Sequence, residues 1–278
     1  MDIFQAIALG VVQGLTEFLP ISSTAHLALL PWFMGWKDPG LTFSVALHVG
    51  TLLAVALYFR QDLTQMFFSW LGSLRGFDRT DPYQKLSWMV IFGCIPAVIA
   101  GFLLDDLIAG IFRSPYVIAA MLIGVAVLIA IAERTTKHTR TWKDMTLKDA
   151  LLIGLAQACA LIPGTSRSGA TIVMGLFLGL ERADAARFSF LLGFPVIFGS
   201  AVLKMKEVVT DPAMLAQLPM IGVGTVAAAL SGYWCIAFLM RFLQTNTMTV
   251  FVVYRIALGL VILGLLITGV YQPAVAAP

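Results

Sequence analysis

The sequence has few charged residues and few cysteines, and each shortage excludes a class of protein. Asp, Glu, Lys and Arg make up 12% of the 278 residues, whereas a soluble globular chain has about 25%. The net charge of +3 is too small for a nucleic-acid-binding protein, so we expect no nucleic-acid partner. Cys94, Cys159 and Cys235 stand far apart in apolar stretches. We therefore expect buried free thiols, with neither a disulfide framework nor a metal-binding cysteine pattern.

Hydrophobic residues, by contrast, are in excess. They make up 59% of the chain, and the mean hydropathy is +0.91. The polar surface is too small to face water, which predicts an all-α polytopic membrane protein with a single membrane domain over residues 1–278. Apolar stretches of suitable length predict about six transmembrane helices, at residues 41–59, 86–104, 116–132, 188–203, 218–240 and 248–270.

Two further apolar regions are interrupted near their middle. Residues 3–34 are broken at Pro20, and residues 150–180 are broken at Pro163 and Gly164. A half such as 150–162 rises only about 20 Å as a helix, which is short of the roughly 30 Å hydrocarbon core. Irregular backbone at that depth must be surrounded by protein or trapped water. We therefore predict two re-entrant helical hairpins.

A weak internal repeat relates these two regions. Gly10-Val-Val-Gln13 matches Gly154-Leu-Ala-Gln157, and in each copy a proline and then a cluster of hydroxyl residues follow. With one hairpin and three spans in each copy, residues 1–132 and 150–270 would form an inverted-topology repeat joined by the basic loop 133–149. Chance similarity between helices rich in small apolar residues is the alternative.

Basic residues predict the orientation. Stretches 60–85 and 133–149, which we expect to be loops, contain several Lys and Arg residues each and are separated by two predicted spans. The positive-inside rule therefore places both stretches in the cytoplasm. The charge pattern does not decide between a re-entrant hairpin and a span at residues 150–180.

Glu17 is an acidic residue inside apolar sequence, where a charge costs about 3 kcal/mol. Gln13 lies one turn earlier on the same helix face. A carboxylate and an amide oxygen on one face suit a hard divalent cation, Mg²⁺ or Ca²⁺. A neutral Glu17 that bonds to Gln13 and holds helices together is the alternative.

The segment after Pro20 supplies hydroxyl groups and a histidine. Ser22, Ser23 and Thr24 suit the start of a second half-helix, where free N–H groups and the helix dipole favour a phosphate. His26 follows within the first turn, close enough to exchange a proton with a bound phosphate or a seryl oxygen. A helix cap beside a satisfied histidine is the alternative.

The segment 163–171, Pro-Gly-Thr-Ser-Arg-Ser-Gly-Ala-Thr, is the more specific signal. Arg167 has a fork of donors that matches phosphate geometry. Such a charge at membrane depth needs an anion, so a ligand or Glu17 should lie opposite it. A purely structural Glu17–Arg167 pair is the alternative. The neighbouring residues that would line a substrate site are Gly164, Thr165, Ser166, Ser168 and Thr171.

Two other polar residues in apolar stretches are predicted to have structural roles. Arg255 has no hydroxyl cluster beside it, so we expect it to bond to carbonyl groups of the hairpins. His48 could face the site or satisfy a backbone carbonyl, and we favour the carbonyl.

Residues 13–26 and 163–171 resemble the two signature regions of the undecaprenyl-diphosphate phosphatases, the BacA-type or bacitracin-resistance family of bacterial inner-membrane enzymes. The resemblance extends through residues 43–55 and 188–196 and covers most of the chain. One departure concerns the first acidic position of the first motif, which is Gln13 here. This glutamine weakens any scheme that needs two carboxylates on a metal ion.

The resemblance implies a hydrolase that converts undecaprenyl diphosphate to undecaprenyl phosphate and phosphate, which recycles the lipid carrier for peptidoglycan and cell-wall synthesis. It also implies dependence on a divalent cation, a site open to the periplasm of the inner membrane, and a homodimer. Gln13 and Glu17 match the metal-associated motif. The segments that match phosphate-handling regions contribute Ser22, Ser23, Thr24 and His26, and Ser166, Arg167, Ser168 and Thr171.

Residues and resemblance together predict Glu17, Ser23, His26 and Arg167 as the catalytic group. Ser23 is our first choice of nucleophile, with His26 or Glu17 moving its proton; attack by His26, or by a water molecule that it activates, remains open. The rival from another class is a secondary transporter or flippase for a phosphorylated lipid or small anion, because inverted repeats with broken helices also build transporters.

Overall fold

The computed structural model describes residues 1–37, 40–104, 114–210, 215 and 217–270. Within these residues the fold has eleven α-helices, one 3₁₀-helix (η2, Trp142–Asp144) and an isolated β-bridge, with no strand. Helices long and apolar enough to cross a membrane are α5 (Pro82–Leu103), α7 (Pro115–Thr135), the Arg182–Leu203 part of α10 (Arg182–Thr210), α12 (Leu218–Phe242) and α13 (Thr249–Ile267). The chain is therefore a polytopic helical membrane protein, and these five helices lie where spans were predicted.

The sixth predicted span, at residues 41–59, coincides with α3 (Gly40–Tyr58). Within the described part of α3, Ala46–Tyr58 forms a shorter apolar helix. Helix α10 begins six residues before the predicted span at residue 188. Arg182 and Arg187, which separated this span from its loop in the sequence, are instead held in the first turns of α10 by Glu133 and Asp62.

The first interrupted region forms two helices that fold back on each other, α1 (Ile3–Phe18) and α2 (Ser23–Phe33). A capping box between Asp2 and Gln5 starts α1, and Pro20 follows its end. The two ends of the pair lie together, because Phe4 and Trp36 meet edge to face with ring centroids 6.1 Å apart. The region is a helical hairpin.

The second interrupted region has the same form. Helices α8 (Leu147–Cys159) and α9 (Arg167–Phe177) are joined through the Pro163 break. The backbone N–H of Arg140, before the hairpin, donates to the carbonyl of Gly179, after it, at 2.9 Å. Glu181 returns a backbone hydrogen bond to Arg140 at 2.7 Å. Entry and exit of this hairpin are thus also side by side.

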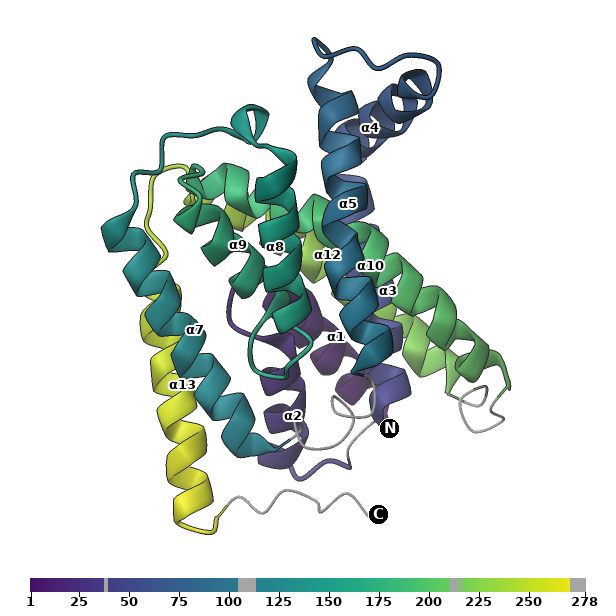
Figure 1. Cartoon of the computed structure of the whole chain (residues 1–278). Helices are drawn as coiled ribbons and strands as arrows, with labels where there is room; N and C mark the ends of the chain where they lie inside the picture. The colour runs from purple at the N-terminus through teal and green to yellow at the C-terminus, as the bar shows by residue number, and fades with distance from the viewer. Residues whose placement is uncertain (38–39, 105–113, 211–214, 216, 271–278) are drawn as a thin grey trace.

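The two hairpins lie at the centre of the molecule, and α7 and α13 run along one side of it (Figure 1). Helix α1 packs on α12, and α8 packs on α5. Both crossings are close because a glycine lies at each contact. A Cβ atom on Gly10 would lie 2.3 Å from the carbonyl oxygen of Gly224, and one on Gly154 would lie 2.1 Å from that of Gly93.

Two expectations from the sequence are wrong. Stretch 60–85 is not simply a connection, because it contains a further helix, α4 (Arg60–Ser73). The polar residues of its first turn suggested a loop. In the structure they begin a helix that leaves Phe67 and Phe68 exposed. Cys94 and Cys235 are buried free thiols as expected, but Cys159 is exposed. Cys159 is the last residue of α8, at the end of the helix.

Candidate functional site

Glu17, in the last turn of α1, lies where the two hairpins meet. Its Oε2 atom accepts a hydrogen bond from Ser23 Oγ at 2.8 Å, and its Oε1 atom lies 3.3 Å from a terminal nitrogen of Arg167. Of the two partners expected opposite Arg167, a ligand or Glu17, the structure shows Glu17. Ser23 is the first residue of α2 and Arg167 the first residue of α9, so the N-terminal ends of two half-helices face one carboxylate.

The backbone before each half-helix takes the same unusual conformation. Ser22 and Ser166 have φ values of 74° and 70°, a left-handed region that costs a residue other than glycine of the order of 1–3 kcal/mol. Each serine is the N-cap of the helix that follows. The turn directs Ser23 and Arg167 from their two breaks toward Glu17. Gly164, with φ of 92°, makes the tight turn before Ser166.

Hydroxyl groups of the second break bind it to the first. Ser168 Oγ lies 3.2 Å from the carbonyl oxygen of Glu17 and 3.1 Å from that of Leu19. Thr171 donates to the carbonyl of Arg167 at 2.7 Å and contacts Ser189 Oγ at 2.6 Å. Ser168 therefore holds the second break against the end of α1, and Thr171 holds the backbone of Arg167.

Gln13 lies beside Glu17, as its spacing predicts. Its side-chain N–H donates to Glu17 Oε2 at 3.1 Å, so its Oε1 atom points elsewhere and has no hydrogen-bond partner among the residues that the structure describes. A buried amide oxygen next to a carboxylate fits the oxygen donors of a Mg²⁺ or Ca²⁺ site. Among the residues that the structure describes, no group of three or more His, Cys, Asp or Glu side chains could hold a metal ion. The protein would therefore supply only a few of the ligands of such a metal ion.

His48 has a larger part in this junction than the sequence suggested. Its Nδ1 atom bonds to the carbonyl of Ser44 at 2.9 Å, as expected, but its Nε2 atom also lies 3.5 Å from Glu17 Oε2. The two functions are compatible because the ring nitrogens point in opposite directions. The sequence allowed both roles for His48, and the expectation that favoured the carbonyl alone was incomplete.

His26 and Thr24 are placed differently from Ser23. Both ring nitrogens of His26 are bonded away from Glu17, to the carbonyl of Ser22 at 2.7 Å and to the hydroxyl of Tyr254 at 2.6 Å. Thr24 is exposed. The structure thus brings Ser23 to Glu17 without His26 or Thr24.

Arg255 has the structural role expected of it. It is fully buried and donates to the carbonyl of Pro20 in the first break and to those of Gly164 and Thr165 in the second. Two further bonds, at 3.0 Å each, go to the carbonyls of Leu122 and Met121 on α7. One guanidinium therefore connects both breaks.

The junction also contains buried polar atoms with no hydrogen-bond partner in the described part of the chain. They are Gln13 Oε1, Ser22 Oγ, Thr165 Oγ1 and Arg167 Nε. Leaving such an atom unpaired costs about 1–3 kcal/mol, and native proteins contain few of them. Four at one junction are unexpected for a purely structural Glu17–Arg167 pair. They favour a site for a polar ligand that bonds to both donors and acceptors.

Comparison with known proteins identifies the family of the chain. The model of a family described as "Bacitracin resistance protein BacA" matches residues 6–261. The chain belongs to the BacA family. A relative named undecaprenyl-diphosphatase from Myxococcus xanthus is 47% identical over 98% of this chain and 92% of its own length. A protein of the same name from Thioalkalivibrio sulfidiphilus is 50% identical, over 93% of this chain and 97% of its own length.

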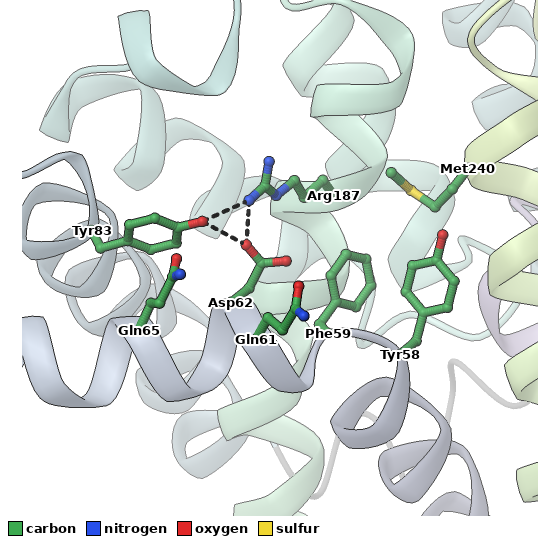
Figure 2. Close-up of a pocket in the computed structure, with 8 residues that line it drawn as sticks. All are labelled: Tyr58, Phe59, Gln61, Asp62, Gln65, Tyr83, Arg187 and Met240. Carbon is green, nitrogen blue, oxygen red and sulfur yellow. Dashed lines mark hydrogen bonds and ion pairs between the residues drawn. The ribbon is translucent and has the colours of Figure 1, made fainter.

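The BacA-family chain has a second polar cluster outside the hairpin junction (Figure 2). A cavity of about 340 Å³ is lined by Tyr58, Phe59, Gln61, Asp62, Gln65, Tyr83, Arg187 and Met240. Arg187 donates to Asp62, and its guanidinium lies 3.4 Å from the hydroxyl of Tyr83. This cluster joins α4, α5 and α10, and no residue predicted for the site lines the cavity.

Aromatic rings separate this cavity from the hairpin junction. Phe59 lines the cavity and packs against Phe190, with centroids 6.2 Å apart. Phe190 in turn meets Phe18, the neighbour of Glu17, edge to face at 5.4 Å. The candidate site of this BacA-family chain is therefore the junction, and the cavity is distinct from it.

Proposed function

We propose that the chain is an integral membrane phosphatase that hydrolyses undecaprenyl diphosphate to undecaprenyl phosphate and phosphate, and so recycles the lipid carrier for cell-wall synthesis. Family membership and relatives of that name over nearly the full length support this activity. The observation that carries it in the structure is the cluster of unpaired polar atoms around Glu17 and Arg167, inside an apolar fold. A diphosphate offers oxygens to the donors of this cluster.

Arg167 and the two half-helix ends would bind the phosphoryl oxygens. Among the described residues, the Nε atom of Arg167 is buried without a hydrogen-bond partner, and the only charged partner of its guanidinium is Glu17 at 3.3 Å. Phosphate between the two N-terminal helix ends would be stabilised by free N–H groups and by both dipoles. As the P–O bond breaks, the guanidinium would stabilise the negative charge that develops.

Ser23 is the nucleophile in this proposal, and Glu17 takes its proton. Their hydrogen bond of 2.8 Å is the geometry of a hydroxyl beside its base. Ser23 Oγ attacks the terminal phosphorus, its proton passes to the Glu17 carboxylate, and undecaprenyl phosphate leaves with the electrons of the broken P–O bond. Water then hydrolyses the phosphoserine and releases phosphate. His26 is the weaker candidate for nucleophile, because both its nitrogens are bonded elsewhere.

Gln13 and Glu17 would hold the divalent cation, Mg²⁺ or Ca²⁺, through the unpaired amide oxygen and the carboxylate. When bound, the ion neutralises charge on the phosphate oxygens. Mg²⁺ commonly takes one or two protein ligands and completes its shell with substrate oxygens and water, which suits so small a set of donors.

We also propose that both hairpins are re-entrant and belong to inverted repeats, residues 1–132 and 150–270. Three observations support this arrangement. The ends of each hairpin lie together. Ser22 and Ser166 share one left-handed conformation. Gly10 and Gly154, equivalent in the repeat, each contact the carbonyl of another glycine, on α12 and α5 respectively.

The remaining parts of the proposal concern the surroundings of the enzyme. The charge pattern supports a cytoplasmic loop at residues 133–149, and the resemblance to the family supports a site open to the periplasmic side of the inner membrane. The resemblance to the family supports a homodimer, which light scattering of the detergent-solubilised protein would detect.

Phosphate release in detergent tests the activity, because transport of lipid has no meaning there. Protein treated with EDTA and then supplied with Mg²⁺ or Ca²⁺ should release phosphate from undecaprenyl diphosphate. Arg167→Ala should lower kcat/KM by about 10²–10³-fold, whereas Arg134→Ala, at an exposed arginine on α7, should leave it unchanged. No release from the folded wild-type protein would contradict the proposal and favour a carrier. A trapped phosphate on His26 would exclude Ser23 as nucleophile.

A further inference from the structure

His48, on α3, presents one ring nitrogen to the carboxylate of Glu17. Its other nitrogen, Nδ1, lies 2.9 Å from the carbonyl oxygen of Ser44. A carbonyl oxygen only accepts hydrogen bonds, so Nδ1 has the proton, and in the neutral ring Nε2 has the free electron pair. Nε2 lies 3.5 Å from Glu17 Oε2, and the side chain of His48 is 30% exposed. The nitrogen that faces the carboxylate is therefore the one that can bind a metal ion.

The distance between these two atoms suits a shared metal ion better than a shared proton. A hydrogen bond between a charged histidine and a carboxylate has a length of about 2.7–2.9 Å. Two ligand atoms that bind one divalent ion at about 2.1 Å are roughly 3.0–3.4 Å apart. The 3.5 Å between His48 Nε2 and Glu17 Oε2 is close to the second spacing. In the neutral ring two electron-rich atoms face one another here, and a cation would relieve their repulsion.

Gln13 adds a third donor beside the same carboxylate oxygen. Its amide nitrogen lies 3.1 Å from Glu17 Oε2, and its Oε1 atom is buried without a hydrogen-bond partner among the described residues. Half a turn of the amide exchanges its oxygen and nitrogen, so the oxygen can face the same point. Gln13, Glu17 and His48 thus offer two oxygens and one nitrogen. Imidazole nitrogen suits transition-metal ions, whereas Mg²⁺ and Ca²⁺ prefer oxygen ligands alone.

The proposed repeat supports a cation on the His48 side of the junction. The Phe-Ser pairs at residues 43–44 and 188–189 match, and in this register Gly193 on α10 corresponds to His48. In the second copy the guanidinium of Arg167 bonds to the carbonyl of Ser189 at 3.1 Å, and it fills the space beside Gly193, where a Cβ atom would lie 1.9 Å from Nη1. In the first copy the ring of His48 bonds to the corresponding carbonyl, that of Ser44. A permanent cation thus occupies one of two equivalent places, and an imidazole occupies the other.

We propose that His48 is a ligand of the divalent cation in this chain, together with Gln13 and Glu17, and that the site therefore prefers a transition-metal ion such as Mn²⁺ to Mg²⁺ or Ca²⁺. The inference deepens the proposed function and rests on it for the role of the ion. A diphosphate has negative charge on both phosphoryl groups. Arg167 supplies positive charge on one side of Glu17, and an ion bound at His48 supplies it on the other.

Metal binding without substrate tests this set of ligands. Detergent-solubilised protein is treated with EDTA and titrated with Mn²⁺ or Ca²⁺ in a calorimeter. Pulsed EPR of the Mn²⁺-loaded protein, with and without ¹⁵N-labelled histidine, detects coupling to a histidine nitrogen. We expect this coupling, and tighter binding of Mn²⁺ than of Ca²⁺.

Replacement of His48 separates the nitrogen ligand from the oxygen ligands. His48→Gln should remove the coupling and weaken Mn²⁺ binding at least about tenfold, because even residues that only orient a metal ligand contribute about 10–100-fold. Binding of Ca²⁺ should change less, because the new side chain offers an amide oxygen. The control is His138→Gln, which should bind Mn²⁺ as the wild type does. His138 also lies near a carboxylate, that of Glu133 at 3.8 Å, but Arg182 already neutralises it.

Three results would overturn the proposal: no binding of Mn²⁺ or binding no tighter than that of Ca²⁺, bound Mn²⁺ without histidine coupling, and coupling that persists in His48→Gln. The activity is judged separately. Phosphate release with Mg²⁺ or Ca²⁺ from a protein that fails these tests would leave the phosphatase standing. A Mn²⁺ site with His48 coupling in a protein that releases no phosphate would contradict the phosphatase and keep His48 as a metal ligand.

Discussion

Arg255 is the residue on which the geometry of both helix breaks depends. A guanidinium has five N–H donors and no acceptor, and here it is surrounded by five carbonyl oxygens from three segments. Carbonyls at a helix break have lost their helical partners, and in an apolar interior no solvent replaces them. Arg255 compensates for both interruptions at once, and so fixes the distance between Ser23 and Arg167.

Replacement of Arg255 should therefore destabilise the fold as well as the activity. Arg255→Met leaves several buried carbonyls unpaired, and we expect a loss of about 3–5 kcal/mol. Arg255→Lys should recover only part of it, because an ammonium is a compact group with three donors. Thermal unfolding of the detergent-solubilised protein measures the change, and Arg134→Met on the exposed end of α7 is the control. If the Arg255→Met protein unfolded at the same temperature as the wild type, the carbonyls would have found other partners.

The residues of the junction differ in how far the sequence predicts them. Glu17 and Arg167 were predictable because a charge in apolar sequence must have a partner, and each was the only such charge beside a helix break. Tyr254 was not predictable, because a tyrosine in a continuous apolar helix resembles any interfacial aromatic. His48 was ambiguous for a related reason, since a carbonyl four residues away can satisfy a histidine in any helix.

Among the elements, the half-helices are positioned by close contacts with spanning helices. Without a hydrophobic driving force between helices in lipid, association depends on packing, and small residues let two backbones approach. Gly154 on α8 lies against Gly93 on α5, and Gly10 on α1 lies against Gly224 on α12. These contacts fix the depth of each half-helix, and thus the height at which the two breaks meet.

A methyl group at Gly154 should separate α8 from α5. The added Cβ would lie 2.1 Å from the Gly93 carbonyl oxygen, so backbone must move, at a cost of about 1–3 kcal/mol. The control is Gly222→Ala on α12, where a Cβ would meet no atom within 4 Å and stability should rise by up to about 1 kcal/mol. Melting temperature and phosphate release should both fall for Gly154→Ala. Equal melting of the two variants would show that α8 does not depend on this contact.

Helix existence followed from the sequence more readily than helix boundaries did. The spans were visible as long apolar runs, and the hairpins as runs interrupted by proline. Helix α4 was hidden because it is amphipathic and lies between two spans, where charged residues such as Arg60 suggested a loop. The early start of α10 was hidden because Arg182 and Arg187 are neutralised by partners from α7 and α4, and these pairings exist only in three dimensions.

For the whole molecule, the paired ends of each hairpin determine the topology. The backbone bonds between Arg140 and residues 179 and 181 place the entry and exit of α8–α9 on one side. The Phe4–Trp36 contact does the same for α1–α2. In the proposed arrangement, three spans separate the two hairpins, so the two pairs of ends would lie on opposite sides of the membrane, and the positive-inside rule would place the second pair, next to the basic loop 133–149, in the cytoplasm.

Single cysteines can test this arrangement in intact cells. In a background with Cys94→Ala, Cys159→Ser and Cys235→Ala, a membrane-impermeant maleimide should label Asp2→Cys and Lys37→Cys from outside. Lys137→Cys and Glu181→Cys should be labelled only after the membrane is opened. The pair at 137 and 181 is decisive, since a spanning second region would put these two positions on opposite sides. Labelling of one but not the other in intact cells would exclude the re-entrant hairpin, and with it a junction at which two half-helices enter from opposite faces.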